Sequence, residues 1–197
     1  RLAAGALSLN TALEVATQIA DALDAAHTAG VIHRDIKPEN IFVGPRDRVK
    51  VLDFGLAKSG PAAQQPDATT VAGTRQGVVM GTAAYMSPEQ AQGWAVDKRT
   101  DIWSLGVTIY EMLTGKLPFQ GENLAAMINS VINSAPEPLK ELRPDVPAGL
   151  DRIVSRALEK SPESRYAGAD ELAHDLSEWR SALSGGAPSA LSVRSLK

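Results

Sequence analysis

Four polar side chains with complementary chemistry lie close together in the sequence: Asp35, Lys37, Asn40 and Asp53. A carboxylate such as that of Asp35 can accept or orient the proton of a hydroxyl group. Residues i and i+2 of an extended loop face the same side, so the ammonium group of Lys37 can reach an anionic group that Asp35 addresses. The side-chain oxygens of Asn40 and Asp53 are hard ligands of the kind that Mg²⁺ prefers. The pattern predicts one site with a general base, a cation and a pair of magnesium ligands.

A short β-hairpin is expected between these residues. The runs Ile41–Val43 and Val49–Leu52 are rich in β-prone residues, and the segment Gly44–Arg48 between them has the composition of a five-residue hairpin loop. The segment His33–Asn40 and the aspartate Asp53 therefore flank the hairpin as loops. Loops held by regular elements are where reactive groups usually lie, so this arrangement favours a functional site.

A long helix is predicted upstream of the hairpin. Apolar residues recur at three- and four-residue spacing over Leu13–Ala26. The pattern Thr11-x-x-Glu14 is typical of a capping box at the start of a helix, and Gly30 is placed to end it. We expect one long, half-buried helix here.

A second helix is expected to run through the core of the domain. The segment Ile102–Leu113 is apolar nearly all round, Asp101 or Thr100 can cap its start, and Gly115 can end it. Further helices, separated by prolines, are expected over Asn123–Asn133, Ala148–Glu159 and Ala169–Leu183.

Composition narrows the class of protein. The chain has 197 residues, of which 44% are apolar, which suits a single globular unit. Its 20 basic and 23 acidic residues give a net charge of −3, so no electrostatic feature favours a nucleic-acid partner. The absence of cysteine suits a reducing compartment, and no apolar run approaches the ~18 residues of a membrane span. We expect a cytoplasmic protein with no membrane segment in this chain.

Two stretches differ in composition from the rest. Ser59–Gly81 is rich in Gly, Ala, Gln and Thr and is expected to be mobile. After Ser184, the sequence Gly185-Gly186-Ala187-Pro188-Ser189 is typical of a tail or linker, so residues 185–197 are predicted to be flexible.

Several motifs extend the pattern of the first site. They are His33-Arg34-Asp35 with Asn40 five residues after the aspartate, Asp53-Phe54-Gly55, Ser87-Pro88-Glu89, Asp101-Ile102-Trp103-Ser104-Leu105-Gly106, and Arg165. In this combination the chain resembles the C-terminal lobe of the eukaryotic-like Ser/Thr protein kinases, most closely their bacterial branch, from Leu7 to about Leu183.

The resemblance implies a fold and an activity. The fold would be mostly α with a small β-hairpin, as in the C-terminal lobe of the two-lobed α+β protein kinase fold, with the N-terminal lobe absent. Residues 1–184 would form this partial kinase domain. The activity would be transfer of the γ-phosphoryl group of ATP, with Mg²⁺, to a Ser or Thr hydroxyl of a protein substrate.

The resemblance also implies roles for individual residues. The catalytic residues would be Asp35, Lys37 and Asn40, the nucleotide would contact Lys37, Asn40, Phe42 and Asp53, and the metal ligands would be Asn40 and Asp53. Phe42 would lie under the adenine ring, although a Phe in a strand can also be plain core. Supporting roles would fall to Thr82 near Asp35 and Lys37, to Glu89 paired with Arg165, and to Asp101 against the backbone of the catalytic loop.

Two further hypotheses concern single residues. A phosphate on Thr69, Thr70 or Thr74 could pair with Arg34 and order the loop, or Arg34 could satisfy only local carbonyl groups. A zinc site at His33 is a weaker alternative, because no second histidine lies at ligand spacing. His27 is expected to pack on its helix.

The sequence departs from the kinase pattern before His33. No glycine-rich phosphate loop is present, the first lysine is Lys37, and the sole upstream glutamate is Glu14. We therefore expect a fragment of a kinase, whose missing N-terminal lobe would be a partner. We also expect apolar surface to be exposed around Phe42, Leu52 and Phe54. The alternatives are a non-catalytic kinase-like binding or regulatory lobe and a helical structural module with coincidental motifs.

Overall fold

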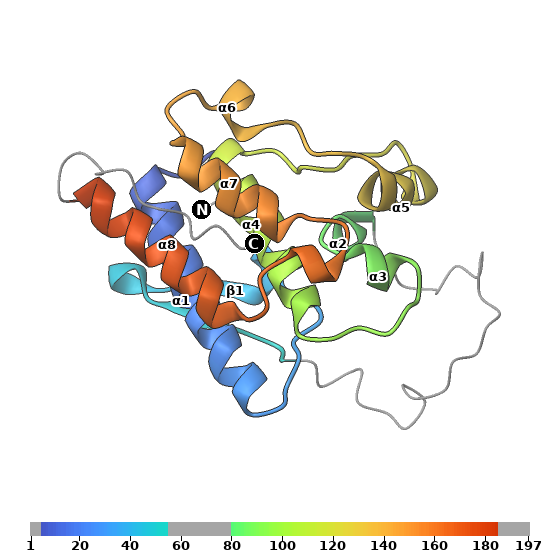
Figure 1. Cartoon of the computed structure of the whole chain (residues 1–197), viewed down its shortest axis with the longest axis horizontal. Helices are drawn as coiled ribbons and strands as arrows, with labels where there is room; N and C mark the ends of the chain where they lie inside the picture. The colour runs from blue at the N-terminus through green and yellow to red at the C-terminus, as the bar shows by residue number, and fades with distance from the viewer. Residues whose placement is uncertain (1–4, 55–79, 185–197) are drawn as a thin grey trace.

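The structure of the chain is a computed structural model that describes residues 5–54 and 80–184 (Figure 1). Its helices are α1 (Leu9–Thr28), α2 (Met80–Ala83), α3 (Pro88–Ala91), α4 (Arg99–Thr114), α5 (Leu124–Asn133), α6 (Leu139–Leu142), α7 (Ala148–Ala157) and α8 (Ala169–Ser184). Strands β1 (Ile41–Val43) and β2 (Val49–Val51) pair antiparallel, with Phe42 opposite Lys50. The expectation of a mostly helical lobe with one small β-hairpin is confirmed.

Helix α4 forms the core of the lobe. Every residue from Thr100 to Tyr110 is buried, as the all-round apolar pattern predicted. The helix ends at Thr114, and its C-cap Gly115 has φ of 72°, the left-handed conformation that glycine adopts without strain. The expected cap was wrong, because Lys98 precedes the helix and Asp101 lies inside its first turn. The carboxylate of Asp101 is therefore available to groups outside the helix.

Helix α1 lies beside α8 and also packs on α4 (Figure 1). The predicted capping box was wrong, because Thr11 already lies within the helix. The helix begins at Leu9, where the hydroxyl of Ser8 accepts a hydrogen bond of 3.2 Å from the backbone amide of Thr11. Gly30, with φ of 77°, follows the C-cap, so the predicted end of the helix is confirmed.

The hairpin is fixed to α1 by the side chain of Gln18. Its Nε2 donates to the carbonyl oxygen of Asp47 at 2.9 Å, and its Oε1 accepts from the amide of Val49 at 3.1 Å. One face of the hairpin packs on the core through Ile41, Val43, Val49 and Val51. On the other face Phe42 is 56% and Leu52 43% exposed, as expected. Phe54, which was expected to share this exposed surface, is half-buried, with its ring centroid 4.8 Å from that of His33.

Three short helices, α2, α3 and α6, were not predicted. Each has four residues, which is too short for an apolar periodicity to be visible in the sequence. Helix α3 has a local signal, since Ser87 and Gln90 form a capping box in front of it and Pro88 occupies its first position. Helix α7 ends at Ala157, earlier than the predicted Glu159, and α5 and α8 match their predicted spans closely.

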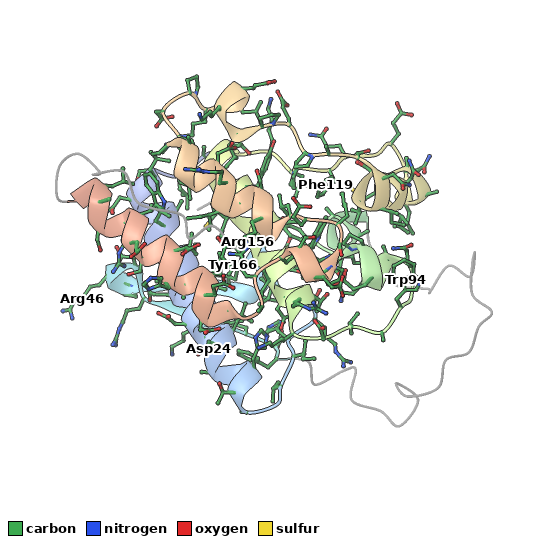
Figure 2. The ribbon with its side chains drawn as sticks, viewed as in Figure 1. Asp24, Arg46, Trp94, Phe119, Arg156 and Tyr166 are labelled. Atoms are coloured by element: carbon green, nitrogen blue, oxygen red, sulfur yellow. The ribbon has the colours of Figure 1, made fainter. Side chains whose placement is uncertain are left out.

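A cluster of cations and aromatic rings surrounds Trp103 of α4. The rings of Trp103 and Phe119 stack with centroids 5.3 Å apart, and the Lys160 ammonium group lies 3.8 Å from the Phe119 centroid. Figure 2 labels the side chain of Phe119. Lys160 also donates to the carbonyl oxygen of Val131 in α5 at 2.6 Å. Burial and the nearby charge of Arg165 lower the pKa of Lys160 to about 8. Lys160 therefore joins α5 to the core while its charge is disfavoured there.

Lys160→Met should change how stability depends on pH. The unfolded lysine keeps its proton up to about pH 10.4, whereas the folded one loses it near pH 8, so the unfolded state binds more protons between these values and wild-type stability rises there. The free energy of unfolding of the wild type, relative to Lys160→Met, should increase from pH 7.5 to pH 9.5 in urea titrations, within the ~8 to ~10 window. Lys140→Met, at an exposed lysine, is the matched control. A constant difference between wild type and Lys160→Met would contradict the prediction.

Candidate active site

The loop after α1 brings Asp35 and Lys37 into contact. The Nζ atom of Lys37 lies 3.0 Å from Oδ2 of Asp35 and 3.4 Å from the hydroxyl oxygen of Thr82 in α2. Between them the side chain of Ile36 is fully buried. The alternation expected of an extended loop is thus present, with the polar pair on one side and the apolar anchor on the other. Thr82 was expected near both residues, and the described contact is with Lys37.

Asn40 orients the carboxylate of Asp35. It ends a short 3₁₀ turn, Pro38–Asn40, and only 8% of it is exposed. Its Nδ2 donates to the backbone oxygen of Asp35 at 2.7 Å and to Oδ2 of the same residue at 3.1 Å. Both contacts use the amide nitrogen, and among the described residues no hydrogen bond to the amide oxygen of Asn40 is present. The sequence suggested a metal ligand, and the structure adds this orienting role.

Asp53 lies two residues after the end of strand β2, close to Asn40 just before the start of β1. The amide of Leu52 donates to the backbone oxygen of Asn40 at 2.8 Å, so the chain leaves the hairpin beside that residue. Asp53 is exposed and has φ of 55°, a left-handed conformation that is uncommon outside glycine and is concentrated at functional sites. No hydrogen bond of the described residues joins Asp53 to Asp35 or Lys37. The hairpin, rather than a side-chain contact, links Asp53 to the loop.

The donor set at this site fits Mg²⁺. Asn40 and Asp53 supply hard oxygen atoms, and the part of the chain that the structure describes has no group of three or more His, Cys, Asp or Glu side chains placed to hold a metal. Mg²⁺ prefers oxygen ligands and keeps waters and phosphate oxygens in its shell, so the oxygen atoms of these two residues are compatible with it. The zinc alternative at His33 is not supported. Both ring nitrogens of His33 are in use, Nε2 at 2.9 Å from the Leu52 carbonyl oxygen and Nδ1 as acceptor from the Asp35 amide at 3.3 Å.

Asp101 braces the backbone of this loop, as expected. Its carboxylate is fully buried and accepts hydrogen bonds from the amide of His33 at 2.9 Å and the amide of Arg34 at 2.7 Å. Arg34 itself has φ of 66°, and its carbonyl oxygen accepts from Nε2 of Gln90 at 2.9 Å. The strained residue Arg34, directly before Asp35, is therefore held through both its backbone amide and its carbonyl oxygen.

Glu89 and Arg165 form a buried ion pair, which the resemblance implied. The guanidinium group donates from Nη1 and Nη2 to the two carboxylate oxygens, each at 2.8 Å, and the two side chains are 5% and 0% exposed. Burial alone would raise the pKa of Glu89, but the hydrogen bonds and charge of Arg165 outweigh it and keep that pKa below its ordinary value. The pair joins α3 to the segment before α8.

Two contacts of the site were missed by sequence reasoning. No role was predicted for Gln90 from the sequence, yet its side-chain amide donates to the carbonyl oxygen of Arg34. His27 was expected to pack on its helix, yet its Nε2 lies 2.8 Å from Oδ2 of Asp101. Both contacts join residues that are far apart along the chain, so no local sequence pattern indicates them.

Some predictions fall on residues that the structure does not describe. Thr69, Thr70, Thr74, Gly55 and the linker 185–197 lie outside the described residues, so the phosphate switch at Arg34 stays a prediction. Within residues 5–54 and 80–184, no helix is long and apolar enough to cross a membrane.

A family model and several curated proteins with sequences similar to this chain are all protein kinases. A family model described as the protein kinase domain matches residues 2–177. A probable serine/threonine-protein kinase of Clostridium acetobutylicum is 44% identical over 173 residues, which cover 88% of this chain and 25% of that protein. The kinase Pkn1 of Myxococcus xanthus is 45% identical over 84% of this chain and 23% of its own length. PknB of Mycobacterium tuberculosis is 40% identical over 87% of this chain and 26% of its own length. The chain thus spans about a quarter of the length of these curated relatives.

Glu89→Gln should destabilise the fold by about 3–5 kcal/mol, because it leaves the buried Arg165 charge without its partner. The folded pKa of Glu89 is lowered, so the stabilisation by the pair is present above the unfolded value of about 4.3 and is lost as pH falls through the folded value. The difference between wild type and Glu89→Gln in urea unfolding should therefore shrink below about pH 4. Glu163→Gln, at an exposed glutamate, is the control. Equal effects of the two substitutions at pH 7 would refute the assignment.

Proposed function

This chain belongs to the protein kinase family, and we propose that the protein containing it transfers the γ-phosphoryl group of ATP to a Ser or Thr hydroxyl of a protein substrate. The observation that carries the proposal is the contact set of Asp35, in which Lys37 and Asn40 both hold the same carboxylate oxygen. The candidate base, a cation and the amide of a candidate metal ligand therefore converge on one carboxylate.

Asp35 is the group that meets the acceptor hydroxyl. Its carboxylate can accept the hydroxyl proton or orient the hydroxyl oxygen toward phosphorus, which is the positioning role that phosphoryl transfer requires. Asn40 holds the carboxylate from its nitrogen, at 3.1 Å, and so limits its rotation. The hydroxyl therefore meets an oxygen atom that is fixed before the substrate arrives.

Lys37 supplies the positive charge beside that oxygen. Phosphoryl transfer spreads negative charge over the equatorial oxygens of the moving group, and a cation already in place stabilises that charge without reorganisation. The ammonium group bridges Asp35 and Thr82, at 3.0 and 3.4 Å, so it lies where the loop and α2 meet. Through its contact with Lys37, Thr82 lies beside the place where the acceptor hydroxyl would bind. This position supports a Ser or Thr acceptor.

Asn40 and Asp53 would hold Mg²⁺ together with the nucleotide phosphates. When bound, Mg²⁺ neutralises charge on phosphate oxygens and orients them. Asn40 and the exposed Asp53 are on neighbouring ends of the hairpin. We assign Phe42, on the exposed outer face of the same hairpin, to contact with the adenine ring, since its 56% exposure is more than a core residue would keep.

The relatives support serine and threonine as acceptors, since each is named a serine/threonine-protein kinase. A protein substrate is the partner that such a family implies, and the intracellular supply of ATP favours a cytoplasmic location. The exposed Phe42 and Leu52 also support a second candidate, a non-catalytic binding lobe that covers this apolar face with a partner. The two candidates differ in whether Asp35 matters for turnover.

Asp35→Asn should abolish most of the transfer. The amide keeps the size of the side chain but cannot accept the hydroxyl proton, so kcat should fall by about 10²- to 10⁴-fold in the full-length protein. Transfer from radiolabelled ATP with Mg²⁺ to a general protein substrate measures kcat, and calorimetry measures ATP binding, which should be retained. Asp21→Asn, at an exposed position of α1, is the matched control.

The outcomes separate the two candidates. A wild-type protein that binds ATP without transferring phosphate would favour the binding lobe. Turnover by Asp35→Asn within a few-fold of wild type would remove Asp35 from its role.

Asp53→Asn should weaken the magnesium-dependent part of nucleotide binding. The substitution removes the negative charge that attracts the cation and keeps the backbone position, so the apparent Mg²⁺ affinity in the presence of ATP should fall about tenfold or more. Titration of Mg²⁺ into the full-length protein with ATP measures this, and ATP binding in the presence of a chelator should change little. An unaltered Mg²⁺ titration would contradict the assignment of Asp53.

A further inference from the structure

We propose that Gln90 of α3 is a positioning residue for phosphoryl transfer, which orients Asp35 by holding the peptide group directly before it. The inference rests on the proposed function for its kinetic consequence, whereas its structural part concerns the loop alone. The juxtaposition that carries it is one side-chain amide shared by the start of α3 and the carbonyl oxygen of Arg34.

The side-chain amide of Gln90 joins two segments that are far apart in the chain. Its Oε1 accepts a hydrogen bond of 3.0 Å from the backbone amide of Ser87, in the capping box of α3. Its Nε2 donates at 2.9 Å to the carbonyl oxygen of Arg34, 56 residues away. A backbone amide can only donate and a carbonyl oxygen can only accept, so both partners are satisfied by this orientation of the amide and by no other. The cap thus aims the nitrogen of Gln90 at the loop.

The group that Gln90 holds leads directly into Asp35. The carbonyl oxygen of Arg34 and the backbone amide of Asp35 belong to one planar peptide group. On the other side of this plane the Asp35 amide donates to Nδ1 of His33 at 3.3 Å, which is long for such a bond. The shorter contact with Gln90 therefore contributes most to the orientation of the plane.

This peptide group needs to be held. Arg34 has φ of 66°, a conformation that a non-glycine residue keeps only where its surroundings impose it. Relaxation of Arg34 would rotate the peptide group and turn the Asp35 carboxylate away from its contacts with Lys37 and Asn40. The position of the proposed base thus depends on the acceptor of the Gln90 hydrogen bond.

Apolar packing does not set the distance between the loop and the segment that carries α3, because a cavity lies between them. Its lining includes Arg34, Asp35, Ile36, Thr82, Tyr85 and Gln90. Within the described part of the chain, two hydrogen bonds join residues 33–37 to residues 80–91: the one from Gln90 and the one from Lys37 to Thr82. The second measures 3.4 Å and comes from a flexible ammonium group. Gln90 is therefore the principal fixed contact across the cavity.

The choice of glutamine argues against a role in capping alone. Glutamate at this position of a capping box accepts from the backbone amide of Ser87 as well as glutamine does. A carboxylate has no hydrogen for the Arg34 carbonyl oxygen, however, and would place two acceptors against each other. Glutamine is explained if the bond to the loop is what this position requires.

The test uses Gln90→Glu in the full-length protein, because this substitution keeps the size of the side chain and the cap but removes the donor. We expect kcat to fall by about 10- to 100-fold with KM for ATP nearly unchanged, as misplacement of a reacting group costs rate rather than binding. Gln92→Glu is the matched control. Gln92 lies directly after the same short helix, and its Nε2 donates at 3.0 Å to the carbonyl oxygen of Pro88, away from the loop. Its kcat should stay within about twofold of wild type.

Gln90→Met separates the loss of the donor from the gain of a charge. Methionine has a similar length and neither a donor nor a charge, so its kcat should fall as that of Gln90→Glu does. If Gln90→Met keeps the kcat of wild type, or if Gln90→Glu and Gln92→Glu lower kcat alike, the positioning role is wrong. Should Gln90→Glu fail to fold, the same measurements on Gln90→Met decide.

Hydrogen exchange separates this inference from the proposed function. The Asp35 amide belongs to the peptide group that Gln90 holds, so Gln90→Glu and Gln90→Met should speed its exchange by about tenfold or more relative to Gln92→Glu. If the wild-type protein transfers no phosphate, the proposed function fails and this exchange measurement alone decides on Gln90. Unchanged exchange at the Asp35 amide in both variants would overturn the inference.

Discussion

The structure depends on the burial of one negative charge, the carboxylate of Asp101, in the first turn of the core helix. A carboxylate without solvent is tolerated only where donors surround it, and here two of those donors are backbone amides of the loop that carries Asp35. The loop cannot move away without leaving the charge unsatisfied. Helix α4 is thus both the centre of the apolar core and the support of the reactive loop.

A second buried charge, that of Arg165, contacts the N-terminal end of α4. Arg165 donates to the backbone oxygen of Arg99 at 3.1 Å and to both carboxylate oxygens of Glu89, while Ser87 and Thr100 share a hydrogen bond of 2.7 Å. The segment before and within α3 is therefore held by the same turn of helix that holds the catalytic loop. The loop with Asp35 and helix α3, which flank the proposed acceptor site, are both held by α4. This shared support keeps their relative position constant.

Local signals and long-range contacts differ in how far the sequence reveals them. The core helix, the hairpin and the glycine at Gly115 follow from apolar period and turn chemistry, which act within a few residues. The start of α1 could not be chosen by pattern alone, since Ser8 and Thr11 are both good caps. The partners of His27 and Gln90 are set by packing between distant elements, so only the folded chain reveals them.

The hairpin places two kinds of surface side by side. Its ends hold the polar groups Asn40 and Asp53, whereas its outer face exposes Phe42 and Leu52. A nucleotide has the same division, since its phosphates are charged and its base is a flat apolar surface. The inward valines of both strands and Gln18 fix the hairpin to α1, so the spacing between the polar ends and the apolar face is rigid. In the proposed function, this rigidity would let one small element recognise both the base and the phosphates.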